Sequence, residues 1–498
     1  MKRRIPFIII LLGSALRFFH LGNRSFWCDE FLAISLARLK LSEMLGFIIG
    51  TDAHPPLFYT IVHFVFNFTQ SEFGLRFLPA LFGAGAIFVF YLLLKQRRDG
   101  DYLFPLALFA LSPAAILWSQ MVKSYSMLTF FTLLSVYAFF SYAKSRRRGH
   151  AALWALSALA ALYLHNYGVI VLAAQVCTVF IYRKELRPKL FLTPLLVILL
   201  GYLPYLAGPV FSQVSFVKGA THTVTNPFLR TAYVFYYNIF GETLSPINLK
   251  FVLPGVFLFF ALFLRGLFSR RDLMHDFALV VFMLALIFIV LIKATIPQNL
   301  MHLQPFFFII VASGLQRVSS KRWKSVFSVI AVLFFIPSLY YYYRGESLQY
   351  HDASKLIPYR QVSRLIQDEG KPGEAIIFTE VRSRSFAGLI EPENPWDWYY
   401  KGNLPLIEIN PINVKEPYKE LEEIYEQYDG VWLLLNYGLT DRSWNDGIKD
   451  FFLDGKSVKI KELRLVKNYS FLDYLKGKGK KEYYFLEVYH LRKVQHDE

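Results

Sequence analysis

Apolar residues are gathered into blocks long enough to cross a membrane, and these blocks recur from Ile5 to Tyr343 and then stop. A hydrocarbon core about 30 Å thick needs about 20 apolar residues in a helix. With 55% hydrophobic residues and a mean hydropathy of +0.35, the chain is too apolar for a soluble protein of 498 residues. The sequence predicts a polytopic α-helical membrane protein with about eleven transmembrane helices. The expected spans are 5–21, 73–94, 102–119, 122–143, 151–164, 166–182, 189–208, 250–268, 276–295, 299–317 and 326–343.

The positive charge of the chain belongs to its membrane part. Residues 1–343 hold 31 Lys and Arg against 11 Asp and Glu, whereas residues 344–498 hold 23 against 26. Of the 31 basic residues, 21 lie at the N-terminus and in five short connections. Positive charge at span ends favours the cytoplasmic side. The pattern therefore predicts a cytoplasmic N-terminus in the cell membrane and an extracytoplasmic C-terminus, and it argues against nucleic acid as a partner.

Two of the connections expected on the outer side are long. The first outer loop covers residues 22–72 and the second covers residues 209–249. In the first loop, the apolar residues from Phe31 to Ile49 recur at helical spacing, which predicts an amphipathic helix in the membrane interface.

The chain is expected to form two domains: a transmembrane module, 1–343, and a soluble extracytoplasmic domain, 344–498. In the second domain helix-like and strand-like segments alternate, which predicts a small α/β domain. This domain has no glycine-rich phosphate loop, no nucleophile elbow and no cysteines at metal-binding spacing. Any chemistry is therefore expected in the membrane module.

Asp29 and Glu30 follow the first expected span and lie between Trp27 and Phe31, whose aromatic side chains predict partial burial at the membrane surface. A carboxylate held in such a place can take a proton from an incoming hydroxyl group. A solvated loop pair or a helix N-cap explains the spacing equally well.

The segment Asp52-Ala53-His54-Pro55-Pro56 comes directly before an aromatic helix start. Proline suits the first turn of a helix, so His54 is expected near a helix N-terminus, where anions are favoured. A purely structural turn is the alternative.

Lys123, within Ser119–Tyr125, lies at the outward junction of two expected spans, and His165-Asn166-Tyr167 lies at another. Lys123 is a candidate phosphate ligand, although a lysine that extends to the interface is the ordinary explanation. A histidine placed like His165 more often packs than reacts.

The motifs around Asp29, His54, Lys123 and His165 are a stronger signal together than singly, because all lie on the expected outer side and combine carboxylates with cations suited to phosphate.

The order and spacing of these motifs, over about a third of the chain, resemble the GT-C superfamily of membrane glycosyltransferases. In particular they resemble the bacterial branch related to dolichyl-phosphate-mannose–protein mannosyltransferases and aminoarabinose transferases. The motifs that carry the resemblance are Phe26–Glu30, His54–Tyr59, Glu72–Ala80, Leu111–Pro113, Ser119–Tyr125 and His165–Gly168.

The resemblance implies a GT-C fold and a polyprenyl-phosphate-linked sugar as donor, used on the outer face and transferred with inversion to a glycan, lipid or protein acceptor. It implies that Asp29 is the general base and that Glu30 supports it or binds the acceptor. The residues that would bind the donor phosphate are His54, Arg76, Lys123 and Tyr125. The residues that would line the donor or acceptor pocket are Trp27, His165, Tyr167 and His302. Some relatives hold a divalent cation near this loop, and the candidate ligands here are Asp52 and His54.

Two features depart from the family pattern. Where the family often has arginine this chain has Lys123, which keeps the charge and loses bidentate geometry. Where the family often has a basic–aromatic pair, residues 298–305 read Gln-Asn-Leu-Met-His-Leu-Gln-Pro, so either His302 takes that place or the phosphate site is built differently.

A transporter or flippase for a lipid-linked glycan is the alternative function. It would require charged side chains along a path at mid-membrane and favours two similar halves, and the sequence indicates neither. A membrane scaffold would leave the motifs of the first outer loop unexplained.

Overall fold

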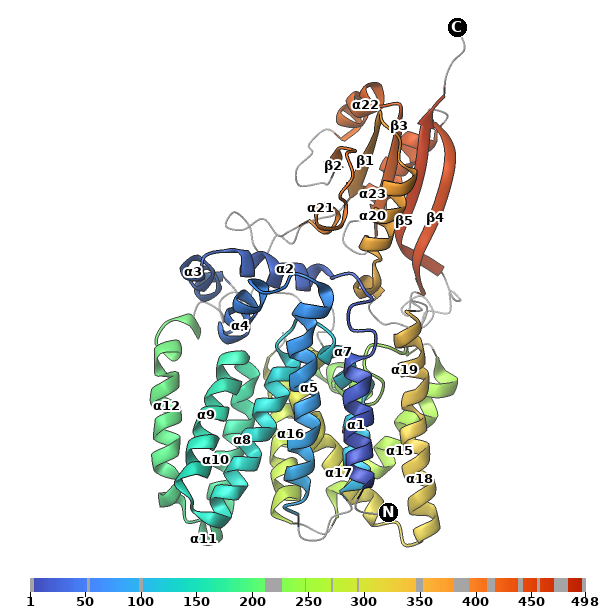
Figure 1. The fold of residues 1–498 in the computed structure, drawn as a ribbon. Helices are drawn as coiled ribbons and strands as arrows, with labels where there is room; N and C mark the ends of the chain where they lie inside the picture. The colour runs from blue at the N-terminus through green and yellow to red at the C-terminus, as the bar shows by residue number, and fades with distance from the viewer. Residues whose placement is uncertain are drawn as a thin grey trace. The chain divides into compact units, whose positions relative to one another are not determined.

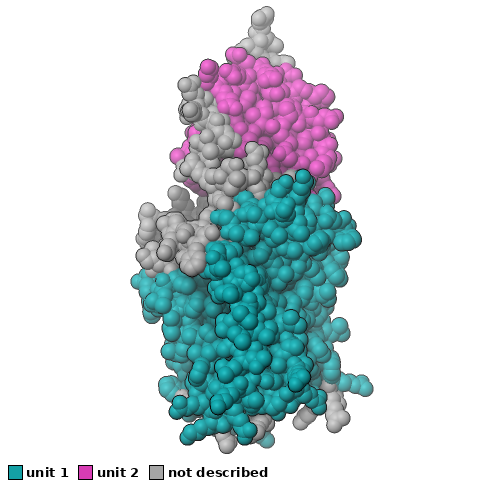
Figure 2. Space-filling model, turned by 90° about the vertical axis from the view of Figure 1, so that its left-hand side faces the viewer, with its two compact units in different colours: residues 1–22, 37–244, 248–342 teal, residues 23–36, 245–247, 343–498 magenta. Residues whose placement is uncertain are grey.

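The computed structural model describes thirteen stretches of the chain, which are residues 4–51, 54–97, 102–210, 226–246, 248–269, 272–292, 295–345, 353–379, 394–409, 417–437, 442–454, 457–469 and 482–494. The chain forms two compact units, coloured separately in Figure 2. The first, which we call the helical unit, comprises residues 1–22, 37–244 and 248–342. The second, which we call the mixed unit, comprises residues 23–36, 245–247 and 343–498.

The helical unit consists of apolar helices whose long members run side by side (Figure 1). Its elements are α1 (Ile5–Phe18), α3 (Leu41–Thr51), α4 (Leu57–Phe66), α5 (Glu72–Leu94), α6 (Leu103–Ala110), α7 (Pro113–Ser119), α8 (Tyr125–Ser145), α9 (Arg148–Leu164), η1 (Asn166–Gly168), α10 (Val169–Ile181), α11 (Arg183–Leu186), η2 (Pro188–Phe191), α12 (Leu192–Leu206), α14 (Pro227–Phe240), α15 (Leu249–Leu267), α16 (Leu273–Leu291), η3 (Pro297–Leu303), α17 (Gln304–Gln316), α18 (Lys321–Leu333) and α19 (Phe335–Arg344), the last of which runs on into the mixed unit.

Six helical segments among the described residues are long and apolar enough to cross a membrane by length and composition, and four shorter apolar helices accompany them. The six segments are Glu72–Leu94, Tyr125–Ser145, Pro188–Leu206, Leu249–Leu267, Leu273–Leu291 and Lys321–Arg344. Large apolar side chains such as Leu11, Leu200 and Phe257 are more than half exposed on these helices and their neighbours. Such a surface suits lipid, so the chain is a multi-pass membrane protein. The predicted number of eleven spans stays a prediction.

Two glycines allow α15 and α17 to cross closely. A Cβ atom on Gly314 would lie 1.8 Å from the carbonyl oxygen of Leu262, and one on Gly266 would lie 2.1 Å from that of Ile310. Small residues on both helices therefore bring the two backbones together, as is typical of helix packing in membranes.

The mixed unit contains a five-stranded sheet with the strand order β2-β1-β3-β5-β4. Strands β1 (Glu374–Thr379), β2 (Leu406–Glu408) and β3 (Gly430–Asn436) are parallel, whereas β4 (Ser457–Tyr469) and β5 (Glu482–Lys493) are antiparallel to their neighbours. The helices of this unit are α2 (Cys28–Arg38, whose last two residues belong to the helical unit), η5 (Ala353–Leu356), α20 (Tyr359–Glu369), α21 (Pro395–Tyr399), α22 (Pro417–Gln427) and α23 (Arg442–Leu453).

Alternate residues of the buried strands pack into two hydrophobic cores, one on each face of the sheet. On one face, Trp432 and Leu434 of β3 pack with residues of α20 and α21. On the other face, Leu433 and Leu435 pack with residues of α22 and α23. The period of two along β3 thus separates two layers of helices, which is an α/β arrangement as the sequence predicts.

The amphipathic helix predicted from Phe31 to Ile49 is two helices, α2 and α3, with a break at residues 39–40. The first of them is not a half-exposed interface helix, because Phe31, Ile34 and Leu36 on it are all buried. The helical spacing of the apolar residues correctly predicts helices in this segment. Spacing alone gives neither the position of the break nor the burial of most side chains of α2.

Candidate functional site

Six of the predicted site residues come together in the helical unit, at the ends of its helices. They are His54, Lys123, Tyr125, His165, Tyr167 and His302. His54 precedes Pro55 and Pro56 at the start of α4, and Lys123 precedes α8. Residues 165–167 form the break between α9 and α10, and His302 lies in η3. Four sequence segments far apart in the chain therefore meet at one place, which we call the histidine cluster.

His165 is the centre of the histidine cluster. Its ring centroid lies 5.1 Å from that of His54, 5.8 Å from that of Tyr125 and 5.4 Å from that of Tyr167. The ring caps the start of η1, because its Nδ1 accepts a hydrogen bond from the backbone N–H of Tyr167 at 3.2 Å. An accepting Nδ1 leaves the ring proton on Nε2 in the neutral form. The side chain of Asn299 interacts with the ring, although no atom of the described stretches meets strict hydrogen-bond geometry with Nε2.

His165 is buried and lies between α9 and η1, outside the predicted spans. Burial holds the pKa of this ring well below its ordinary value, and the nearby His54, His302 and Lys123 lower it further. The ring is therefore neutral at physiological pH, and its Nε2–H is a hydrogen-bond donor that carries no charge of its own.

His302 ties two of the segments together. Its side chain is fully buried, and its Nε2 donates to the backbone oxygen of Tyr167 at 3.1 Å. The hydroxyl group of Tyr167 in turn lies 2.7 Å from Oγ1 of Thr295. These bonds hold η1 against the last turn of η3 and against the segment that precedes η3, so His302 maintains the shape of the histidine cluster.

A small cavity opens between Lys123 and His54. Its volume is about 10 Å³, and its other lining residues are Phe58, Tyr59, Ser124 and Tyr125. A cavity of this volume holds about one water-sized group. As it stands, the cavity has room for a single oxygen atom of an anion and not for a whole phosphate.

Arg76 is buried in the first turns of α5, which begins with Ser71 as a side-chain cap. One of its terminal nitrogens lies 3.4 Å from the backbone oxygen of Leu21. This contact ties α5 to the segment that follows α1 and gives Arg76 a structural task in addition to its predicted phosphate role.

Asp29, Glu30 and Trp27 lie in the mixed unit, in and before the first turn of α2. Glu30 is fully buried, and its Oε2 accepts a hydrogen bond from the backbone N–H of Trp27 at 3.3 Å. A glutamate that reaches back from the third helical position in this way is half of a capping box. Asp29 is half-buried, and its Oδ1 accepts from the thiol of Cys28 at 3.8 Å. Within the pair, Glu30 therefore caps the helix and Asp29 is the candidate base.

Two amide side chains belong to this region although the sequence did not single them out. Asn299 Oδ1 accepts from the hydroxyl group of Tyr125 at 3.5 Å. Gln120 donates from Nε2 to three carbonyl oxygens at the end of α1 and accepts from the hydroxyl group of Tyr342 at 2.6 Å. Gln120 thus fixes the segment that leads to Lys123. An uncharged amide in an apolar block carries no signal of such a role.

The predicted metal ligand Asp52 lies outside the described residues, so its geometry with His54 is not defined. Among the stretches that the structure describes, no three His, Cys, Asp or Glu side chains are grouped in a way that could hold a metal ion.

The fold resembles those of several solved proteins. ArnT from Cupriavidus metallidurans in the apo state aligns over 97% of both chains, with a TM-score of 0.55 and 12% identity. The same protein bound to undecaprenyl phosphate aligns over 98% of both chains, with a TM-score of 0.52 and 10% identity. The apo oligosaccharyltransferase of Archaeoglobus fulgidus aligns over 99% of this chain and 74% of its own, with a TM-score of 0.51 and 12% identity. At these identities the likeness shows the fold alone.

The sequence comparisons agree with this fold. Residues 41–184 match the family model of dolichyl-phosphate-mannose-protein mannosyltransferase. An uncharacterized protein of Aquifex aeolicus (strain VF5) is 27% identical over 336 residues, which is 64% of this chain and 66%, just under two thirds, of that protein. The chain is thus related to the GT-C membrane glycosyltransferases, and the predicted resemblance is confirmed.

Proposed function

We propose that this protein is an integral-membrane glycosyltransferase that moves a sugar from a polyprenyl-phosphate donor to an acceptor hydroxyl group on the outer face of the cell membrane. The proposal is supported by the family match at residues 41–184 and by the GT-C fold. The neighbour ArnT has been solved with undecaprenyl phosphate, a carrier of this class. In the proposed orientation the N-terminus is cytoplasmic and residues 344–498 are extracytoplasmic.

The observation that carries the proposal is the histidine cluster. It combines the Lys123 ammonium and the His54 ring with the neutral, buried ring of His165. Charged and neutral donors that converge in a buried place suit an anion that gains charge as it leaves. We assign the donor phosphate to this cluster, with Tyr125 as a further donor and with Tyr167 and His302 in the supporting roles predicted for them. Trp27, in the mixed unit, keeps its predicted role as a pocket residue near Asp29.

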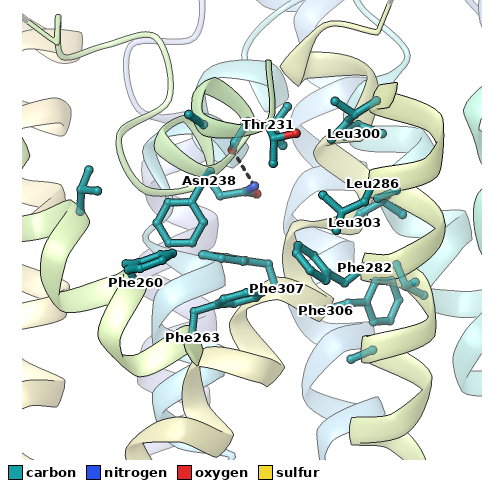
Figure 3. A pocket seen from close by; sticks show the side chains of 18 of the residues that line it. Thr231, Asn238, Phe260, Phe263, Phe282, Leu286, Leu300, Leu303, Phe306 and Phe307 are labelled. Atoms are coloured by element: carbon teal, nitrogen blue, oxygen red, sulfur yellow. Dashed lines mark hydrogen bonds between the residues drawn. The ribbon is translucent and has the colours of Figure 1, made fainter. Parts of the chain in front are cut away.

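A second feature suits the lipid part of such a donor. A cavity of about 480 Å³ lies among α14, α15, α16, η3 and α17, and seven of its lining residues are phenylalanines. Figure 3 shows the rings of Phe260, Phe263 and Phe307 at its wall, with Thr231 and Asn238 as its polar members. An apolar cavity of this size suits a hydrocarbon chain.

The short helix η3 connects the two features. Leu300 and Leu303 of η3 line the apolar cavity, while His302 of the same helix belongs to the histidine cluster and Asn299 contacts Tyr125 of it. Helix η3 thus presents apolar side chains to the cavity proposed for the isoprene units and polar side chains to the region proposed for the phosphate. A polyprenyl phosphate has an apolar part and an anionic part, which these two sides suit.

In the proposed reaction the acceptor oxygen forms a bond to the anomeric carbon of the sugar while the bond from that carbon to the phosphate oxygen breaks, with inversion. The proton of the acceptor hydroxyl passes to the Asp29 carboxylate and then to solvent. Polyprenyl phosphate leaves, and Lys123 and His54 stabilise its added charge. A divalent cation bound by Asp52 and His54 is a separate proposal, which the response of the activity to a chelator tests.

The test is transfer of a radiolabelled sugar from a polyprenyl-phosphate donor by the purified full chain in nanodiscs. We expect Asp29→Asn to lower kcat by about 10²–10⁴-fold, the usual contribution of a general base, while the donor KM stays the same. Glu30→Gln is the matched control, because its amide oxygen can still accept the bond from the Trp27 N–H. Full activity of a correctly inserted Asp29→Asn variant would refute the base assignment. Movement of an intact lipid-linked glycan across the bilayer without transfer would instead establish the flippase alternative.

A further inference from the structure

The segment that carries the predicted base belongs to the same compact unit as the C-terminal part of the chain. Residues 23–36 group with residues 343–498, although more than 300 residues separate them in the sequence. The contacts within this unit show what holds the segment.

Hydrogen bonds fix the backbone before the carboxylates. The N–H of Phe26 donates to the hydroxyl group of Tyr399 at 2.8 Å. The N–H of Arg360 donates to Oγ of Ser25 at 3.0 Å, and the Arg360 guanidinium donates to the carbonyl oxygen of Asn23 at 2.6 Å. Three successive points of the segment are therefore attached to α20 and α21.

Aromatic packing fixes the chain after the carboxylates. Phe31 is 1% exposed, and its ring lies edge-on to those of Tyr359, Trp398 and Tyr399 at centroid distances of 6.4, 6.0 and 6.1 Å. Trp398 also contacts the ring of Phe26 at 6.1 Å. Edge-on pairs at these distances are favourable, so the aromatic residues of α21 hold the segment on both sides of residues 28–30.

Helix α21 is itself anchored in the core of the unit. Asn394 caps its first turn by accepting from the N–H of Trp396 at 2.8 Å, and Trp396 is buried against Tyr359 at a centroid distance of 4.9 Å. The ammonium group of Lys355 adds a contact over the ring of Trp27 at 4.9 Å. The rigid core of the C-terminal part is thus connected to the residues next to Asp29.

We propose that Trp398 and Tyr399 are positioning residues for catalysis: they hold residues 23–36 so that Asp29 is presented in one fixed orientation. The C-terminal part is then a component of the catalytic apparatus and not only a cover or an acceptor platform. This inference rests on the proposed function in taking Asp29 as the base. A base must lie within hydrogen-bond reach of the proton it removes, and a displacement of about 1 Å costs about 10²-fold in rate.

The test measures position and activity separately. The chain has two cysteines, Cys28 and Cys177, so a Cys177→Ala background leaves the thiol next to Asp29 as the single reporter. The measured quantities are the rate of thiol labelling at Cys28, kcat and the donor KM, all on the full chain in nanodiscs. The variants are Trp398→Ala, Trp398→Phe and Tyr399→Phe. The matched control is Tyr437→Phe, which removes a hydroxyl group on the α23 side of the sheet, where it bonds to Asp446.

We expect Trp398→Ala to raise the labelling rate of Cys28 at least fivefold and to lower kcat 10–100-fold with the donor KM unchanged. Tyr399→Phe should show smaller changes of the same kind, Trp398→Phe should restore most of both properties, and Tyr437→Phe should change neither. An unchanged labelling rate in Trp398→Ala would overturn the inference, as would equal effects in Tyr437→Phe. Faster labelling with unchanged kcat would also overturn the inference, because a loosened segment would then not limit catalysis. Full activity of Asp29→Asn would instead refute the proposed base, so the two failures are distinguishable.

Discussion

Glu374 at the start of β1 is a buried carboxylate whose replacement tests how the sheet of the mixed unit is held together. It is 3% exposed and takes part in three hydrogen bonds, with the N–H of Lys371 at 3.0 Å, the indole N–H of Trp432 at 3.1 Å and Nε2 of His490 at 2.9 Å. Burial alone would raise the pKa of Glu374, but these bonds and the charge of His490 outweigh it and lower the pKa below 4.5. The ionised form is therefore the one that the fold stabilises.

The change Glu374→Gln removes the charge and keeps the shape. The amide oxygen can still accept from Lys371 and Trp432, while the amide NH₂ group faces His490. Hydrogen bonds to a charged group contribute about 1.5–3 kcal/mol and neutral ones about 0.5–1.5 kcal/mol. Three bonds that each lose about 1 kcal/mol of charge assistance give a loss of about 3 kcal/mol in the stability of the sheet at neutral pH.

The effect depends on pH with a definite sign. A carboxyl group whose pKa is lowered by folding stabilises the fold above its unfolded pKa, and this stabilisation is lost as the pH falls through the folded pKa. The glutamine side chain does not titrate. The difference in stability between the wild type and Glu374→Gln should therefore be complete at pH 7 and shrink as the pH falls below 4.5.

Hydrogen exchange of the β3 amides in the full chain measures this local stability. A loss of about 3 kcal/mol corresponds to about 150-fold faster exchange at pH 7. The control is Glu462→Gln on β4. Its partners Lys459 and Arg464 have side chains that are 47% and 54% exposed, so this change should alter the exchange rate no more than about fivefold. An acceleration below tenfold in Glu374→Gln, or a difference of the same size at pH 4 and pH 7, would refute the reasoning.

Three further predictions concern the membrane helices and the proposed donor site. Lys123→Met should lower kcat/KM for sugar transfer by about 10²–10³-fold, whereas Lys123→Arg keeps the charge and should keep more of the activity; equal activity of Lys123→Met and wild type would exclude a phosphate role. Gln120→Leu removes the bonds to three carbonyl oxygens at the end of α1, which should destabilise the helical unit by about 2–4 kcal/mol, and an unchanged thermal midpoint in detergent would contradict this. Phe307→Trp should narrow the apolar cavity and raise the KM of a long-chain donor more than that of a short-chain donor; a KM raised equally for both would place the lipid elsewhere.

Periodicity predicted much of the architecture, because helices and strands bury their side chains with different periods. The alternation of helix-like and strand-like segments expected in residues 344–498 is seen in α20 followed by β1 and in α22 followed by β3. The interruptions of the apolar blocks were missed. The span expected at 102–119 is two helices, because the Ser112 side chain caps a new start before Pro113, and a serine followed by proline is a signal that could have been read.

The sequence partly predicts that the residues of the histidine cluster lie close together. His54, Lys123 and His165 each lie at a helix end, and alternating topology places these ends on one side of the membrane module. Asn299 and Gln120 could not be found, since an amide gains its role only from the partners that the fold supplies. The attachment of residues 23–36 to α20 and α21 was also invisible, because a contact between Phe26 and Tyr399, 373 positions apart, leaves no pattern in the spacing of either segment.

The predicted base and the predicted phosphate ligands lie in different compact units: Asp29 in the mixed unit, and Lys123 and His54 in the helical unit. If both take part in one reaction, perturbations of the two units should separate kinetically. Loosening the attachment at Trp398 leaves the histidine cluster intact, so it should change kcat and spare donor binding, whereas Lys123 variants should change how the phosphate is bound and released. A C-terminal domain that lacks reactive motifs of its own is then retained for catalysis because it orients a carboxylate contributed by the first loop of the chain.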